Sequence, residues 1–148
     1  MKRSRASLVM VICVLAAASA FAAFGEELKP PVGYGIGRAP TDSASVAAGA
    51  KIYATNCVPC HGKAGHGDGP TGVALKPRPR DFASPKEFKS KNDDEVFLVV
   101  SKGGPVLKLS AGMPPWGGML NKAQIWQVIA YVRGFPARDS LAKAHATK

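Results

Sequence analysis

Cys57-Val58-Pro59-Cys60-His61 is the most informative stretch of the 148-residue chain. Two thiols separated by two residues lie on adjacent points of one helical turn, and a histidine follows at once. This C-x-x-C-H spacing is the attachment signature of a covalently bound haem, in which the thiols form thioethers to the two vinyl groups. The imidazole then becomes the proximal ligand of the iron. The sequence therefore predicts one haem c, held by Cys57 and Cys60 and ligated by His61.

Three other uses of the two cysteines are weighed against haem. A disulfide would consume both thiols, but it leaves His61 unexplained. A thioredoxin-like redox motif follows a strand, whereas the segment 46–56 before the motif has a helical pattern. Structural zinc needs four ligands, and the motif offers three, with only His66 in a loop nearby. Haem accounts for all three residues of the motif.

The first residues have the pattern of an export signal. Basic side chains at positions 2, 3 and 5 precede an uncharged, Ala-rich run over 6–24. We expect a signal peptide over residues 1–22, cleaved after Ala22, with Ala20 and Ala23 as alternative sites. The competing interpretation is an uncleaved membrane anchor, for which the run is of borderline length. The remaining cysteine, Cys13, lies within this segment and would leave with the signal peptide. The mature protein would be periplasmic.

The chain is basic, with 20 Lys and Arg against 10 Asp and Glu, a net charge of +10. Loss of three basic residues with the signal peptide leaves 17 − 10 = +7. Nucleic acid is an improbable partner, because the lysines are scattered through loops and the protein is exported. The charge favours an anionic protein or membrane surface as partner. A solvated basic face without a partner is the alternative.

Helical patterns account for the rest of the predicted fold. Three amphipathic segments are expected, over 46–56, from 93 to 102 and from 122 to 133, and no strand signal is present. Each begins with a residue suited to capping: Ser43 or Ser45 for the first, Asn92 with Glu95 for the second, and Asn121 with Gln124 for the third. The sequence predicts an all-α domain.

These features resemble the class I cytochromes c, especially the bacterial branch related to the small haem subunits of cbb3-type oxidases. Besides the haem motif, the resemblance is carried by Gly49 and Tyr53, by Val128 and Tyr131, and by the stretches 65–70 and 113–116. It covers residues 44–135 and implies a fold of three to five helices wrapped around one haem. It leaves 23–43 as a Pro/Gly-rich extension and 136–148 as a polar tail.

The resemblance also implies the remaining site residues. Met113, directly before two prolines, is expected to be the second axial ligand, and Met119 to pack in the core. Pro70 occupies the place from which the family's backbone carbonyl holds the ligating histidine, with Pro77 and Pro79 as rivals. Trp116 is expected near the haem edge. His66 could contact a propionate, although a surface position is the commoner outcome, and His145 has no assigned role.

The family carries single electrons by outer-sphere transfer between redox proteins, and this is the function expected here, without catalysis. Five lysines are candidates for steering an acidic partner: Lys63, Lys76, Lys102, Lys108 and Lys122. One alternative is a haem enzyme or gas sensor in which Met113 does not coordinate. Another is a dedicated subunit of a larger complex, docked through residues 34–38.

Overall fold

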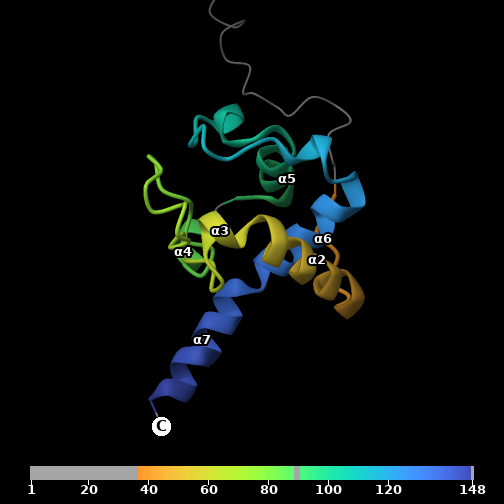
Figure 1. Cartoon of the computed structure of the whole chain (residues 1–148). Helices are drawn as coiled ribbons and strands as arrows, with labels where there is room; N and C mark the ends of the chain where they lie inside the picture. The colour runs from red at the N-terminus through yellow and green to blue at the C-terminus, as the bar shows by residue number, and fades with distance from the viewer. Residues whose placement is uncertain (1–36, 89–90, 148) are drawn as a thin grey trace, which may run out of the picture.

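Helices are the regular elements of the computed structural model, which describes residues 37–88 and 91–147 (Figure 1). No strand occurs within these ranges, so the all-α prediction is confirmed. In chain order the elements are α2 (Ser43–Asn56), α3 (Val58–His61), α4 (Pro85–Phe88), α5 (Asp93–Lys102), the 3-10 helices η1 (Gly104–Leu107) and η2 (Trp116–Gly118), α6 (Lys122–Arg133) and α7 (Phe135–Ala146).

Side-chain caps define where the longer helices begin. Asn92 accepts a hydrogen bond from Glu95 N at 2.8 Å, and Glu95 accepts one from Asn92 N at 3.2 Å. Asn121 and Gln124 form the same reciprocal pair at the start of α6. Both capping boxes were expected from the sequence. The cap of α2 is Asp42 and neither serine, because the Asp42 carboxylate accepts from Ser45 N at 2.8 Å.

Among the described helices, α2 and α6 make the most extensive contact. A Cβ on Gly49 would lie 1.9 Å from the carbonyl oxygen of Gln127 and 3.1 Å from Tyr131 Cβ. Only glycine therefore permits this approach of the two backbones. One turn later Tyr53 is buried, with its ring 5.3 Å from that of Tyr131 and 5.1 Å from that of Phe135.

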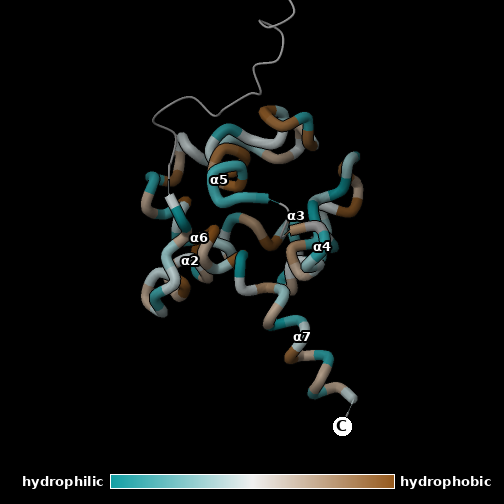
Figure 2. Tube along the Cα trace, turned by 180° about the vertical axis from the view of Figure 1, so that it is seen from behind, coloured by the Kyte–Doolittle hydropathy of each residue, from teal (hydrophilic) through white to brown (hydrophobic). Residues whose placement is uncertain are grey.

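The core contains two clusters of buried residues, and α6 contributes to both. The first is built around Phe97, Ile125 and Ile129, all nearly inaccessible to solvent. The second contains Tyr53, Phe88, Val128, Val132 and Phe135. Hydrophobic residues remain outside these clusters, notably in η1 at the upper end of Figure 2, where Val106 is exposed.

The described chain begins with a segment that packs on the domain. Gly37 N donates to Asp94 at 3.1 Å, and Ala39 N donates to Asp93 at 2.8 Å. Arg133 Nε reaches the same Asp93 carboxylate at 2.7 Å. The packed unit thus starts before residue 44. The predicted signal peptide (1–22), and the predicted extension up to residue 36, lie outside the described residues.

Most of the segment 136–148, expected as a polar tail, lies in helix α7, which was not predicted from the sequence. Pro136 lies in its first turn, where its missing N–H has no helical partner to lose. Phe135 is buried at the base, and the Arg138 guanidinium lies 4.2 Å from the centre of the Tyr131 ring. Beyond this base α7 extends away from the rest of the molecule (Figure 1), and Leu141 is exposed.

Substitution of Gly49 tests the helix crossing. Alanine normally stabilises a helix interior relative to glycine. We expect Gly49→Ala to do the opposite and to lower the free energy of unfolding by about 1–3 kcal/mol, because the added methyl overpacks the α2–α6 contact. Gly118→Ala is the matched control, since a Cβ there would meet nothing within 4 Å. Chemical unfolding of both variants checks this, and equal stability of the two would contradict the proposed contact.

Candidate haem site

The C-x-x-C-H residues lie on the short helix α3, which directly follows α2. Cys57 is both the last residue capping α2 and the residue before α3. Its carbonyl accepts a hydrogen bond from His61 N at 2.8 Å, so the motif forms one helical turn. Both cysteines are free thiols. Burial raises the pKa of Cys57 to about 12, the opposite of the depressed pKa that a reactive redox cysteine needs.

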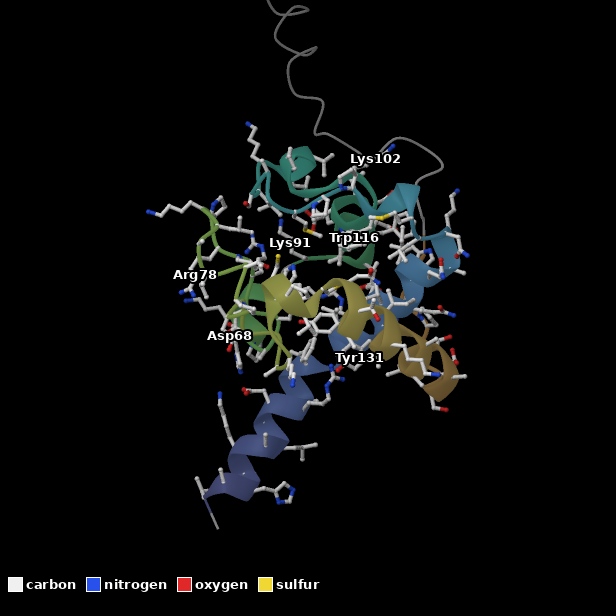
Figure 3. All side chains as sticks on the ribbon, viewed as in Figure 1. Asp68, Arg78, Lys91, Lys102, Trp116 and Tyr131 are labelled. Carbon is white, nitrogen blue, oxygen red and sulfur yellow. The ribbon has the colours of Figure 1, made fainter. Side chains whose placement is uncertain are left out.

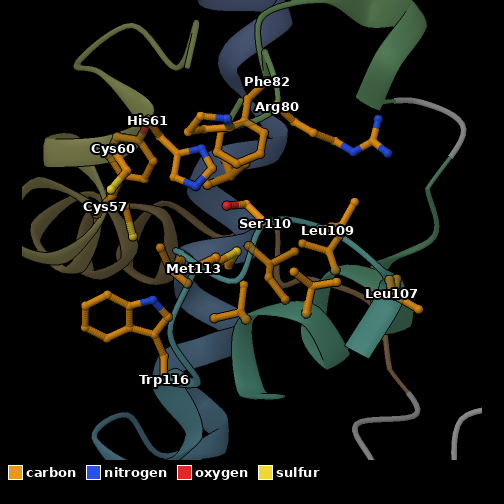
Figure 4. Close-up of a pocket in the computed structure, with 18 of the residues that line it drawn as sticks. Cys57, Cys60, His61, Arg80, Phe82, Leu107, Leu109, Ser110, Met113 and Trp116 are labelled. Atoms are coloured by element: carbon orange, nitrogen blue, oxygen red, sulfur yellow. The ribbon is translucent and has the colours of Figure 1, made fainter. Parts of the chain in front are cut away.

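An apolar cavity of about 500 Å³ lies beside α3 (Figure 4). This volume is within the range of about 300–1,000 Å³ typical of small-molecule and cofactor sites. Its walls come from α5, α6 and the loops on either side of α5. The apolar side chains that form them include Phe82, Val96, Val99, Val100, Leu107, Leu109, Val128, Ile129 and Val132.

His61 projects into this cavity beneath an aromatic ring. The imidazole stacks on Phe82, with ring centres 4.5 Å apart and planes inclined by 15°. Burial lowers the pKa of His61 to about 4, and the backbone of Arg80 opposes part of this shift. Nδ1 is buried and has no hydrogen bond of good geometry among the described residues, although the Arg80 backbone is close enough to interact with the ring. A neutral imidazole has the lone pair that binds iron.

Met113 faces His61 across the cavity. Figure 4 shows the His61 ring and the Met113 side chain entering from opposite walls, with Cys57 and Cys60 at one edge between them. The loop that carries Met113 is fixed to the start of η1, just after α5, because Gly104 N donates to the Met113 carbonyl at 3.0 Å. Met119 lies outside the cavity lining and is 66% exposed, so the expectation that it packs in the core is wrong.

The loop after the motif packs on the back of α3. Thr71 Oγ1 donates to the Pro59 carbonyl at 2.7 Å and lies 3.1 Å from the Cys60 sulfur. A Cβ on Gly72 would lie 2.0 Å from the Cys60 carbonyl oxygen. Gly69 N also donates to the Cys60 carbonyl at 3.2 Å, so the loop over 69–72 supports α3 from outside the cavity.

Pro70 does not lie beside His61. It is exposed and absent from the cavity lining, whereas Pro77 and Pro79 line it, and the backbone nearest the imidazole is that of Arg80. The chain reaches the ring later than expected, because Phe82 N donates to the Gly65 carbonyl at 2.7 Å and draws residues 79–82 over His61.

The other predicted residues divide between cavity and surface. Trp116 lines the cavity, on the side of Cys57 in Figure 4. His66 lies outside it, with Nδ1 3.2 Å from Asp81 and Nε2 3.5 Å from Asp139 of α7. All five candidate steering lysines are exposed. Sequence reasoning missed Arg78, Arg80 and Lys91, which line the cavity. The signal for the two arginines was the basic stretch Pro-Arg-Pro-Arg over 77–80, and Lys91 had none.

The residues present fit a haem. Two free thiols lie at one edge of an apolar cavity, and a neutral imidazole and a thioether face each other across it. In the part of the chain that the structure describes, no three His, Cys, Asp or Glu side chains gather to hold a metal ion. Within the same residues no helix has the length and hydrophobicity needed to cross a membrane.

Comparisons with known proteins agree with this site. Residues 44–132 match the model of the family described as cytochrome c oxidase, cbb3-type, subunit III. Cytochrome c6 of a Synechococcus strain is 32% identical over 93 residues, which cover 63% of this chain and 72% of the relative. Cytochrome c6 of a Picosynechococcus strain is 29% identical over 63% of this chain and 75% of its own.

A solved structure of similar fold is also similar in sequence. The reducing HAO-like protein complex of Kuenenia stuttgartiensis contains a chain that superposes with a TM-score of 0.58 and is 27% identical. The match covers 77% of this chain but only 53% of that one, about half of its length. Since the family match spans more than half of the present chain, the protein belongs to the cbb3-type cytochrome c oxidase subunit III family and is a class I c-type cytochrome, a protein of electron transfer.

Proposed function

We propose that this cytochrome is an exported carrier of single electrons with one covalently bound haem c, and that it is not an enzyme. The observation that carries the proposal is the facing pair of His61 and Met113 across an apolar cavity with two free thiols at its edge. Two protein ligands would leave no position on the iron for a substrate. The periplasmic location rests on the signal-peptide pattern of the first 22 residues.

Covalent attachment follows from the two thiols. Each Cys S–H would add across one vinyl C=C bond, with the sulfur bonding to the inner carbon and the hydrogen going to the outer carbon. The addition is redox-neutral, so it needs reduced cysteines and no oxidant. Both thiols are free, and the turn of α3 presents them at the same edge of the cavity (Figure 4).

The haem would supply reversible one-electron redox chemistry. The residues around it favour electron transfer over catalysis. Phe82 holds the orientation of the His61 ring by stacking. The valines of α5 and α6 keep water from the cavity. The Pro114-Pro115 pair stiffens the loop that presents Met113.

Redox proteins with an acidic docking face are the partners that the charge favours. The net charge is positive, and Lys63, Lys76, Lys102, Lys108 and Lys122 are exposed. The same charge permits peripheral contact with an anionic membrane surface, whereas nothing in the chain favours nucleic acid.

A second candidate is a dedicated cytochrome subunit of a dehydrogenase or oxidase complex. It is favoured by the similarity to a chain of the reducing HAO-like protein complex. The segment at 34–38, proposed to dock such a subunit, falls mostly outside the described residues. Copurification from the native membrane and periplasmic fractions distinguishes a free carrier from a subunit.

Removal of both thiols tests the attachment. We expect Cys57→Ser with Cys60→Ser to lose all haem retained on a denaturing gel, since no thioether remains. Each single variant should retain less haem than the wild type and should be degraded faster, because much of the core around α3 packs on the porphyrin. A haem stain of the periplasmic fraction measures this. Absence of retained haem in the wild type itself would refute covalent attachment.

Substitution of Met113 tests the axial ligand and separates carrier from catalyst. We expect Met113→Ala to lose the weak long-wavelength sulfur-to-iron absorption and to bind carbon monoxide when reduced. Its reduction potential should fall markedly, because axial ligands set haem potentials over a range of about 0.8 V. Met119→Ala is the matched control, because Met119 is exposed. Rapid carbon monoxide binding by the unmodified protein would instead support an enzyme or sensor with an open site.

Ionic strength tests the docking surface. If exposed lysines steer an acidic partner, the rate of electron transfer should fall steeply as salt rises toward about 0.15 M, where the screening length is about 8 Å. Replacing the five lysines by glutamine should flatten the dependence without changing the absorption spectrum. A rate in the wild type that does not depend on salt would exclude steering and leave the carrier function standing.

A further inference from the structure

The mostly apolar cavity is also lined by three basic residues and by the carboxylates of Asp81 and Glu95. Arg78 and Arg80 come from the loop before α4, and Lys91 comes from the residues just before α5. Lys91 Nζ lies 3.2 Å from Glu95, which lines the same wall. Among the described residues, neither the Arg78 nor the Arg80 guanidinium has an ion pair or a side-chain hydrogen bond. Both arginines are exposed where they border the cavity, and an anion bound there would give either guanidinium a partner of opposite charge.

The shape of haem specifies where that anion would be. Haem carries its two vinyl groups on adjacent pyrrole rings and its two propionates on the other two, so the carboxylates lie at the edge opposite the thioethers. Cys57 and Cys60 fix the vinyl edge on one side of the cavity. The Arg80 side chain extends on the other side, away from both cysteines (Figure 4).

Arg80 lies beside a stretch of backbone with more contacts than the backbone around Arg78. The Arg80 main chain lies against the His61 ring, and the next residue, Asp81, accepts hydrogen bonds from Ala83 N at 2.9 Å and Ser84 N at 3.2 Å. Phe82 is stacked on His61. Arg78 precedes this anchored stretch and lies at the outer margin of the molecule in Figure 3.

We infer that the Arg80 guanidinium, assisted by Lys91, binds the propionate carboxylates of the haem. The inference rests on the haem of the proposed function and adds residues that hold its polar edge. The planar fork of arginine matches a carboxylate with two parallel hydrogen bonds, which a lysine cannot supply. Lys91 contributes less, because Glu95 already shares its charge. Arg80 then acts at two points, with its backbone beside the axial histidine and its side chain at the opposite edge.

The competing role for Arg80 is that of a surface charge that steers a protein partner. The two roles differ in what they change. A cation beside a propionate stabilises the ionised carboxylate and lowers its pKa by about 1–3. It also shifts the reduction potential of the isolated protein and makes that potential depend less on pH around neutrality. A steering charge changes only the rate with a partner and its salt dependence.

The test is a redox titration at several pH values of the purified holoprotein and of the variants Arg80→Gln, Arg80→Lys, Lys91→Gln, Arg78→Gln and Arg38→Gln. Arg38 is exposed and absent from the cavity lining, so Arg38→Gln controls for net charge. We expect Arg80→Gln to lower the potential and to raise by about 1–3 the pKa seen in its pH profile. Arg80→Lys should restore part of both, and Lys91→Gln should show a smaller change of the same sign.

Three results overturn the inference: Arg80→Gln behaves as Arg38→Gln does, Arg78→Gln gives the larger change, or Arg80→Gln alters only the salt dependence of transfer to a partner. A haem stain and the absorption spectrum of each variant show whether haem is attached through both thioethers. If haem does not attach to Arg80→Gln, the pH profiles of Arg80→Lys and Lys91→Gln are compared with that of Arg38→Gln instead. Profiles equal to that of Arg38→Gln then overturn the inference. Absence of covalent haem from the wild type would count against the proposed function, whereas attached haem with unchanged titrations counts against Arg80 alone.

Discussion

The contact of the Gly49 backbone with the carbonyl of Gln127 is the constraint on which the site depends. It brings α2 across α6 at a separation that no larger residue permits. The end of α2 is thereby fixed over the second core cluster, and Cys57 begins the haem motif at that point. Tyr53 completes the arrangement, because its hydroxyl donates to the Gly62 carbonyl at 2.8 Å and ties α3 back to α2. The positions of both thiols and of His61 follow from this crossing.

The surroundings of His61 are assembled from segments distant in the sequence. The hydrogen bond from Phe82 N to the Gly65 carbonyl places an aromatic ring on the imidazole and the Arg80 backbone at its edge. The ring of Phe82 also lies 5.1 Å from that of Phe88, which in turn lies beneath the Arg133 guanidinium. His61 is thus held through Phe82 by residues of α4 and α6 as well as by its own helix.

Local signals in the sequence predicted the features that depend on a few neighbouring residues. The capping boxes of Asn92 with Glu95 and of Asn121 with Gln124 are of this kind, and so is the helical turn that carries the two cysteines. Met113 was distinguished from Met119 by family resemblance, and the cavity lining includes only Met113 of the two.

Features that depend on the path of the chain in space were missed. The choice of Arg80 over Pro70 beside His61 is set by how the loop over 62–82 returns to α3, which no local pattern encodes. Helix α7 was missed for another reason: its residues carry no continuous apolar face, and its anchor is the packing of Phe135 and Arg138 on Tyr131. Tertiary contact at one end stabilises a helix that its own sequence marks only weakly.

The adjacency of α2 and α6 also has a consequence for local opening. The two helices close the intervening chain into one long loop, which carries both His61 and Met113. The Met113 segment has a backbone hydrogen bond to Gly104 N at the start of η1, its other backbone bonds are within the segment, and Gly117 packs on Ser101 of α5. The segment can therefore detach while the α2–α6 crossing stays closed, so its amide protons should exchange with solvent by a lower-energy opening than those of α6. The segment that carries Met113 would then open as a unit distinct from the α2–α6 pair.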